Sequence, residues 1–267
     1  MGEARVETEE GVATLLLDGF PQSAVDLEDE TVLHFEYVQH LALALDVLRP
    51  GRSLRVTHVG GGALSLPRWV ALTRPGSPQV VLEPDAALTE LVRRRLPLPR
   101  GHRIRVRPVG GAEGMAALRD ASADVVVLDA FVDGRLPAEL STLEWLSGAR
   151  RVLGPTGLLL ANVPDEPGLR YLARVAAGAH EAFGHSALLG LQEVLKGRRF
   201  GNVVLLASST PLDLYTLRRA AASAPLPTGV LSRAELVRRA PGARPLLAGE
   251  GGMPSPPPPD PRAWRRR

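Results

Sequence analysis

Two neighbouring stretches of sequence decide the fold: Val56-Thr57-His58-Val59-Gly60-Gly61-Gly62 and Val80-Val81-Leu82-Glu83-Pro84-Asp85. The first is an apolar run that ends in three glycines. The second is an apolar run that ends in an acid, Glu83, which lies 21 residues after Gly62. Glycines after a first strand let the backbone approach a ligand closely, and an acid after the next strand accepts hydrogen bonds from ribose hydroxyls. The pattern predicts a nucleoside site but does not specify a reaction.

Strands and helices alternate regularly around these stretches. Apolar runs predict strands over residues 54–59, 79–83, 104–109, 124–129, 157–163, 186–191 and 202–207. Helical spacing predicts helices over residues 31–48, 63–72, 86–95, 113–119, 142–153 and 169–183, with two small ones over 212–222 and 232–240. Several strands are apolar on both faces, which is typical of parallel strands covered by helices. The sequence predicts an α/β protein with a doubly wound, Rossmann-like sheet.

Three regions follow from this pattern. Residues 1–30 predict a short N-terminal β-hairpin, in which strands over 12–17 and 23–27 flank a turn with Asp18-Gly19. Residues 31–248 form the predicted nucleoside-binding catalytic domain. Residues 249–267 are rich in Pro and Arg, and we expect this tail to be disordered because it offers little apolar area to bury.

The composition of the 267 residues favours a soluble globular enzyme, with 45% hydrophobic and 23% charged residues. No cysteine is present, which excludes disulfides and a cysteine nucleophile. No apolar run approaches the roughly 20 residues of a membrane span. The first residues lack the order of a signal peptide, so we expect a cytoplasmic protein without membrane contact.

Nucleic-acid binding is not expected, although the isoelectric point is near 9.9. The formal net charge is only +3, and the last six residues alone carry four arginines. The other arginines are scattered, and few aromatic residues are available to stack on bases.

A few residues of the sequence could take part in catalysis or ligand binding. Asp129 ends an apolar strand, where α/β sheets bind their ligands, although it could simply cap the following loop. Tyr37 is either a site residue or a residue that packs in the core. Gln22 is either a site residue or an exposed strand residue. Asp133-Gly134 predicts a plain turn. The six histidines show no metal-ligand spacing, so no metal is expected.

The arrangement resembles the spermidine synthase (polyamine aminopropyltransferase) family over roughly residues 12–208. The segments that carry the resemblance are Leu17-Asp18-Gly19-Phe20-Pro21-Gln22, Phe35-Glu36-Tyr37-Val38-Gln39, Gly60-Gly61-Gly62, Leu82-Glu83-Pro84-Asp85, Asp124-Val125-Val126-Val127-Leu128-Asp129 and Phe200-Gly201-Asn202 with the strand after it. These are similar to the family's L-D-G-x-x-Q hairpin, F-x-Y-x-E helix, G-G-G-D-G loop, V-E-I-D strand end, D-V-I-I-x-D strand and closing strand.

The resemblance implies a class I methyltransferase-type fold, a homodimer and transfer of an aminopropyl group from decarboxylated S-adenosylmethionine to a polyamine. It implies that Asp129 is the base and that Tyr37 orients the amine. It also implies that the nucleoside is bound by residues outside this pair: Gln22, Gly60, Gly61, Gly62, Glu83 and Gly110.

Several family acids are absent. Ala63 replaces the aspartate of the glycine-rich loop, Gly111 and Val132 replace two more, and Gln39 replaces the helix glutamate. Two alternatives therefore stay open: a methyltransferase that uses S-adenosylmethionine itself, and a catalytically weak protein that binds a nucleoside.

Overall fold

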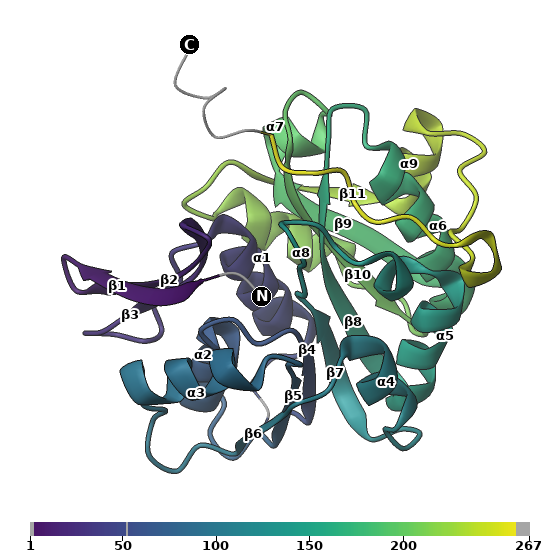
Figure 1. The fold of residues 1–267 in the computed structure, drawn as a ribbon. Coiled ribbons are helices and arrows are strands. Elements are labelled where there is room, and N and C mark those ends of the chain that lie inside the picture. Colours follow the sequence, from purple (N-terminus) through teal and green to yellow (C-terminus); the bar gives the residue numbers. More distant parts are fainter. Residues whose placement is uncertain (1–2, 52, 260–267) are drawn as a thin grey trace.

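The computed structural model describes residues 3–51 and 53–259, and these form a central eight-stranded sheet with helices on both faces (Figure 1). The strand order is β11-β9-β10-β8-β7-β4-β5-β6. The strands are β4 (Val56–Val59), β5 (Gln79–Leu82), β6 (Ile104–Arg107), β7 (Ala123–Leu128), β8 (Leu153–Asp165), β9 (His185–Leu191), β10 (Gly201–Ser208) and β11 (Thr228–Ser232). The doubly wound α/β sheet predicted from the sequence is confirmed.

Five neighbouring strands of the sheet, from β8 through β7, β4 and β5 to β6, are parallel. The remaining three, β10, β9 and β11, pair antiparallel to their neighbours. The sequence pattern did not predict β11, which is a short edge strand of mixed polarity and only partly buried. The chain order of the parallel strands reverses on the two sides of β4, so the ligand-binding crevice of such a sheet lies beside that strand.

The helices cover the two faces of the sheet (Figure 1). They are α1 (Glu36–Leu48), α2 (Ser65–Thr73), α3 (Ala86–Arg95), α4 (Gly111–Ala116), α5 (Leu143–Val152), α6 (Arg170–Phe183), α7 (Gln192–Leu195), α8 (Leu214–Ala222) and α9 (Arg233–Arg239). Strand β7 illustrates why both faces are apolar: Val126 and Leu128 join the core under α5 and α6, whereas Val125 and Val127 join the core under α1 and α8. Alternation of side chains across a pleated strand produces this division.

The N-terminal region is a three-stranded antiparallel sheet rather than the two-stranded hairpin predicted from the sequence. It consists of β1 (Ala4–Glu9), β2 (Val12–Leu17) and β3 (Phe20–Asp26) in that order. The predicted turn at Asp18-Gly19 is confirmed, because Leu17 pairs with Phe20 and both turn residues have positive φ. The missed strand β1 is an exposed edge strand with charged residues, so it has no continuous apolar face to signal it.

The prediction of disorder from residue 249 is wrong for the part of the tail that the structure describes. Residues 252–258 pack against the loop that follows β7, and Ser255 in the middle of this segment is fully buried. Hydrogen bonds, which composition does not reveal, hold the segment in place. The rest of the predicted tail, residues 260–267, lies outside the described residues.

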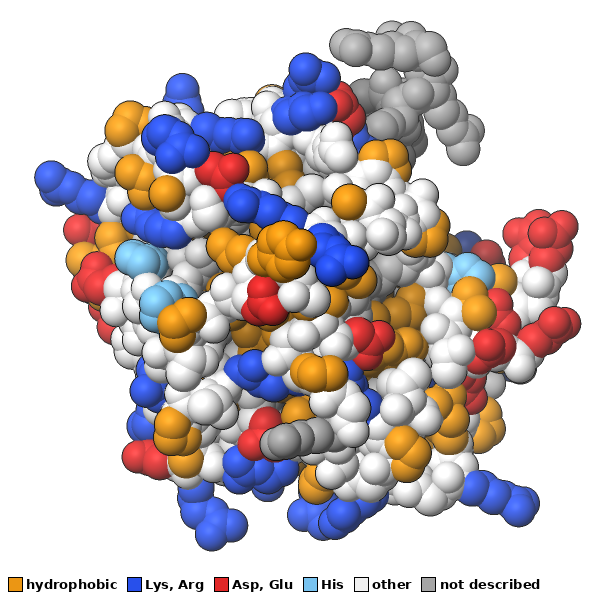
Figure 2. All heavy atoms as spheres, turned by 180° about the vertical axis from the view of Figure 1, so that it is seen from behind, with side chains coloured by type: hydrophobic (Ala, Val, Ile, Leu, Met, Phe, Trp, Pro, Cys, Tyr) orange, Lys and Arg blue, Asp and Glu red, His pale blue; other side chains and the backbone are white. Residues whose placement is uncertain are grey.

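The rear face of the molecule carries scattered Arg and Lys side chains among neutral and apolar ones (Figure 2). Acidic side chains gather instead at the protruding end of the N-terminal sheet, where Glu7, Glu9 and Glu10 are exposed. Of the helices within residues 3–51 and 53–259, none is sufficiently long and apolar to cross a lipid bilayer.

Candidate active site

The candidate site begins where β4 and β7 end side by side. Val59 and Leu128 are the last register partners of these strands, and Gly60 and Asp129 come directly after them. A Cβ atom on Gly60 would lie 2.1 Å from the backbone oxygen of Asp129, and Gly60 has a φ of 97°. Only glycine fits this close approach and this backbone conformation. The chain thereby brings the glycine loop and the acid after β7 to one point.

The side chain of Asp129 is desolvated but not sealed off from solvent. Asn162 on β8 donates its side-chain amide to Oδ1 of Asp129 over 2.9 Å. Burial raises the pKa of Asp129 from 3.8 to about 6, and the hydrogen bond from Asn162 and the nearby Tyr37 hydroxyl only partly oppose this. An acid with such a pKa near neutrality can accept and release a proton under physiological conditions.

Tyr37 lies in the first turn of α1, close to Asp129. Its hydroxyl lies close enough to the Asp129 carboxylate for each group to influence the pKa of the other. Burial and the nearby negative charge raise the pKa of Tyr37 well above 10. Tyr37 therefore stays a neutral donor at any physiological pH, and its ring packs 6.1 Å from that of Phe35. Tyr37 and Asp129 thus lie close to each other, and the roles expected of them from the sequence stay predictions.

Glu83 follows β5 and holds the neighbouring glycine loop. Its Oε2 accepts the backbone N–H of Gly61 over 2.9 Å, and its Oε1 accepts that of Asp85 over 3.0 Å. A Cβ atom at Gly61 would lie 3.2 Å from the Glu83 side chain, so glycine lets the carboxylate approach without a shift of either residue. A shallow depression lies beside these groups and is lined by Gly61, Gly62, Glu83 and Thr89 among others.

The N-terminal sheet covers the glycine loop next to Gln22. Ser23 is buried, and its hydroxyl lies 2.7 Å from that of Ser65 at the start of α2. The same Ser65 hydroxyl donates to the backbone oxygen of Ala24 over 2.7 Å. A Cβ atom on Gly62 would lie 3.4 Å from Cβ of Ser23. Gln22, the residue before Ser23 on β3, is half-buried, and no described group forms a hydrogen bond with its side chain.

Gly110 follows β6 and begins α4, and its carbonyl accepts the N–H of Gly114. The next residue, Gly111, is packed so closely that a Cβ there would lie 2.4 Å from Val59. Ala63, where the family has an acid, is fully buried among apolar side chains. Gln39 donates to the backbone oxygen of Leu33. Three of the four positions without family acids are thus occupied by close packing or structural contacts, whereas the fourth, Val132, is exposed.

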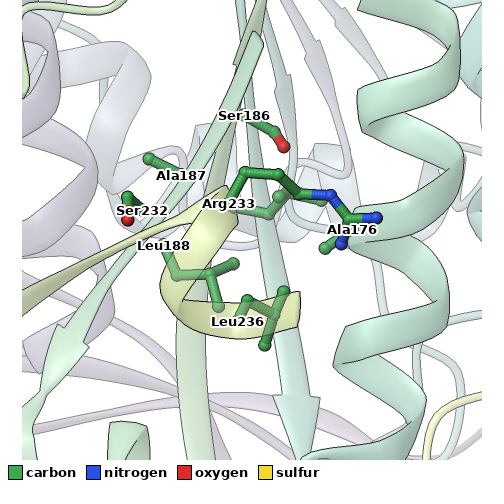
Figure 3. Close-up of a pocket in the computed structure, with 8 residues that line it drawn as sticks. Ala176, Ser186, Ala187, Leu188, Ser232, Arg233 and Leu236 are labelled. Carbon is green, nitrogen blue, oxygen red and sulfur yellow. The ribbon is translucent and has the colours of Figure 1, made fainter. Parts of the chain in front are cut away.

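A second shallow depression lies between α6, β9, β10 and the start of α9 (Figure 3). Its lining is mainly apolar, with Ser186, Ser232 and Arg233 at its edge. It shares no residue with the groups around Asp129 and Glu83, so it does not belong to the candidate site.

Asn162 is the site residue that sequence reasoning missed. It is 1% exposed in the otherwise apolar strand β8, and its Oδ1 has no hydrogen-bond partner among the described residues. The signal available in the sequence was a single amide in the run Leu158-Leu159-Leu160-Ala161-Asn162-Val163. A buried polar group in a central strand requires an explanation, and its bond to Asp129 supplies one.

Comparisons with known proteins identify relatives of the chain, although no family model matches it. A polyamine aminopropyltransferase of Vibrio vulnificus (strain CMCP6) is 29% identical over 140 residues, which cover 51% of this chain and 46% of that protein. The chain thus aligns with about half the length of that curated relative.

Solved structures extend the comparison over nearly the whole fold. A probable spermidine synthase from Corynebacterium glutamicum ATCC 13032 has a TM-score of 0.84 at 29% identity, covering 92% of this chain and 94% of that one. Human methyltransferase-like protein 13 in complex with SAH has a TM-score of 0.57 at 22% identity, covering 70% and 90%. The second likeness concerns the fold alone. The chain is therefore similar to proteins named spermidine synthase and polyamine aminopropyltransferase, and it shares the methyltransferase-like α/β fold.

Proposed function

We propose that the protein transfers an aminopropyl group from decarboxylated S-adenosylmethionine to a polyamine acceptor. The observation that carries the proposal is the meeting of a raised-pKa carboxylate, Asp129, with the glycine loop at the reversal of strand order. The relatives named spermidine synthase and polyamine aminopropyltransferase support it. In this proposal Glu83 holds the ribose, and Gln22 with Gly60, Gly61, Gly62 and Gly110 lines the rest of the nucleoside.

The reaction would need help with a proton. A primary amine has a pKa of about 10.4, so at neutral pH it is mostly protonated and cannot attack. Asp129 would hold the ammonium and take one proton as the amine nitrogen attacks the carbon next to the sulfonium. The new N–C bond forms while the C–S bond breaks, and its electron pair neutralises the sulfur. Methylthioadenosine leaves as a neutral thioether, and Tyr37 orients the amine from the other side of Asp129.

The donor's identity is tested by the nucleoside that the reaction releases. Purified protein would receive decarboxylated S-adenosylmethionine or S-adenosylmethionine, each with a panel of di- and polyamines, and products would be measured by mass spectrometry. We expect methylthioadenosine to appear only with the decarboxylated donor and only when an amine is present. Its absence from every amine reaction would contradict the proposal.

A methyltransferase is the second candidate function, favoured by one observation. Ala63 is fully buried in an apolar cluster, so the glycine loop offers no carboxylate at that position to a donor ammonium group. In the same assay, S-adenosylhomocysteine from S-adenosylmethionine would establish this alternative. Binding of methylthioadenosine without any turnover would indicate the non-catalytic binder. A homodimer and a cytoplasmic location stay predictions.

The activity should depend on pH through Asp129. We expect kcat/KM to fall below a pH of about 6, because protonated Asp129 can neither pair with an ammonium nor accept its proton. Asn162→Leu removes the hydrogen bond that favours the charged carboxylate, so the pKa of Asp129 should rise and the acid limb should move to higher pH. Rate profiles between about pH 5 and 9 measure the limb. An unmoved limb in the variant would show that Asp129 does not control it.

A further inference from the structure

The described end of the chain lies along the loop that follows Asp129. Residues Gly252–Pro258, here named the C-terminal strap, run beside the segment 131–141, and Figure 1 shows the yellow segment crossing the loop between β7 and α5. The hydroxyl of Ser141 donates to the backbone oxygen of Met253. Gly252 also lies against Ala138, because a Cβ atom on Gly252 would be 3.2 Å from the backbone oxygen of Ala138. The strap therefore contacts this loop along most of its length.

Ser255 is the anchor of the strap. It is the only residue between Pro254 and Pro259 with a backbone N–H, since its neighbours in this stretch are all prolines. That N–H donates to the carbonyl of Leu136 over 3.1 Å, and the N–H of Leu136 donates to Oγ of Ser255 over 2.9 Å. The carbonyl of Ser255 accepts Nε of Arg135 over 2.6 Å. Every polar group of this fully buried serine is thus used to hold residues 135 and 136.

The held residues close a tight turn beside the candidate base. Val132 and Arg135 exchange backbone hydrogen bonds of 2.9 and 3.0 Å around Asp133 and Gly134, whose φ angles of 50° and 70° confirm the turn predicted from the sequence. Pro258 of the strap lies on this turn, because a Cβ on Gly134 would be 2.8 Å from its ring. Val132, three residues after Asp129, is 63% exposed.

We propose that Ser255 is a positioning residue and that the strap fixes the turn Val132–Arg135 as a wall on the acceptor side of Asp129. The core holds the turn on one side only, because the side chain of Leu136 is fully buried whereas Val132 at the other end of the turn is exposed to solvent. Without the strap, the backbone N–H of Leu136 loses its partner and the turn becomes free to move. The inference rests on the proposed function, because that proposal is what places the acceptor beside Asp129.

Two truncated chains separate the strap from the residues beyond it. One chain ends at Pro259 and keeps the strap, and the other ends at Glu250 and removes it. Hydrogen exchange measured by mass spectrometry should show faster exchange of residues 131–140 in the shorter chain, by at least tenfold, and no change in the longer one. Equal protection of the loop in both chains would overturn the inference, and this readout does not require any activity.

Enzyme kinetics then distinguish whether Ser255 positions the loop for acceptor binding or only stabilises the fold. For the chain ending at Glu250 and for Ser255→Ala, we expect the acceptor KM to rise about tenfold while the dissociation constant of methylthioadenosine stays within twofold. Equal loss of acceptor and nucleoside binding would indicate general destabilisation and overturn the inference. If no variant, including the full chain, has aminopropyl activity, the proposed function fails, whereas the exchange experiment still decides the role of the strap.

Two glycine variants serve as a control for the effect of backbone strain. Gly134→Ala places a Cβ against Pro258, whereas Gly19→Ala in the other Asp-Gly turn meets nothing within 4 Å, although both glycines have strongly positive φ. Gly134→Ala should raise the acceptor KM and the exchange rate of residues 131–140, and Gly19→Ala should change neither. Identical behaviour of the two variants would count against a role of the strap.

Discussion

Asp129→Asn is expected to reduce turnover by a factor on the order of 10²–10⁴, which is the range that a positioned general base contributes. Binding of methylthioadenosine should stay within about twofold, because Glu83 and the glycine loop make their contacts without Asp129. The amide of the variant keeps the shape of the carboxylate and can still accept the hydrogen bond from Asn162. Steady-state kinetics and calorimetric titration measure the two quantities separately.

The same substitution should stabilise the fold. Burial raises the pKa of Asp129 from 3.8 to about 6, so the folded protein binds the proton more tightly than the unfolded chain does. Protonation of Asp129 therefore stabilises the folded protein at low pH, and this stabilisation is lost as the pH rises through 6. At pH 7 the folded protein holds a charged Asp129 carboxylate that burial disfavours. Removing that charge should raise the free energy of unfolding by roughly 1–3 kcal/mol, or the Tm by several degrees.

Asp124→Asn is the matched control at the other end of β7. Asp124 accepts the backbone N–H of Arg55 over 2.8 Å and pairs with its guanidinium, and these bonds lower the pKa of Asp124 although burial opposes them. The control should therefore lose stability at pH 7 and keep its turnover. If Asp129→Asn lowered the Tm or kept its activity, Asp129 would be a structural cap of the loop rather than the base.

The sequence predicted those parts of the fold that short-range patterns encode. Apolar strands that alternate with helical spacing were sufficient for the sheet, and the three glycines and Glu83 singled out in the sequence do lie together after β4 and β5. The tail was predicted wrongly because Ser255 is held by residues about 120 positions away in the chain. Composition carries no information about a contact between such distant segments.

Asn162 was missed for a related reason. Its role depends on pairing between β7 and β8, which places a lone amide next to Asp129 across 33 positions of sequence. The strands β1 and β11 were not predicted because both lie at sheet edges, where fewer side chains are buried and the apolar pattern of the sequence is weaker. Sequence patterns thus predicted the buried centre of the fold better than its edges or its long-range hydrogen bonds.

Glu83→Gln is expected to weaken methylthioadenosine binding by roughly 10- to 100-fold, because hydrogen bonds to a charged group contribute about 1.5–3 kcal/mol. Its two oxygens already accept the N–H groups of Gly61 and Asp85, and a glutamine has only one oxygen for these donors and for ribose hydroxyls. The glycine loop should therefore loosen together with the ribose contact. Isothermal titration calorimetry measures the dissociation constant.

Glu90→Gln removes the same charge from α3, where Glu90 is exposed and paired only with Arg94, and should leave the affinity unchanged. At saturating donor, Glu83→Gln should retain most of its kcat, since the Tyr37–Asp129–Asn162 group is intact. Glu83→Gln would then lose affinity without losing chemistry, whereas Asp129→Asn would lose chemistry without losing affinity. An equal loss of kcat and affinity in both variants would mean that the two carboxylates act as one structural unit, and the division into a nucleoside side and an acceptor side would be wrong.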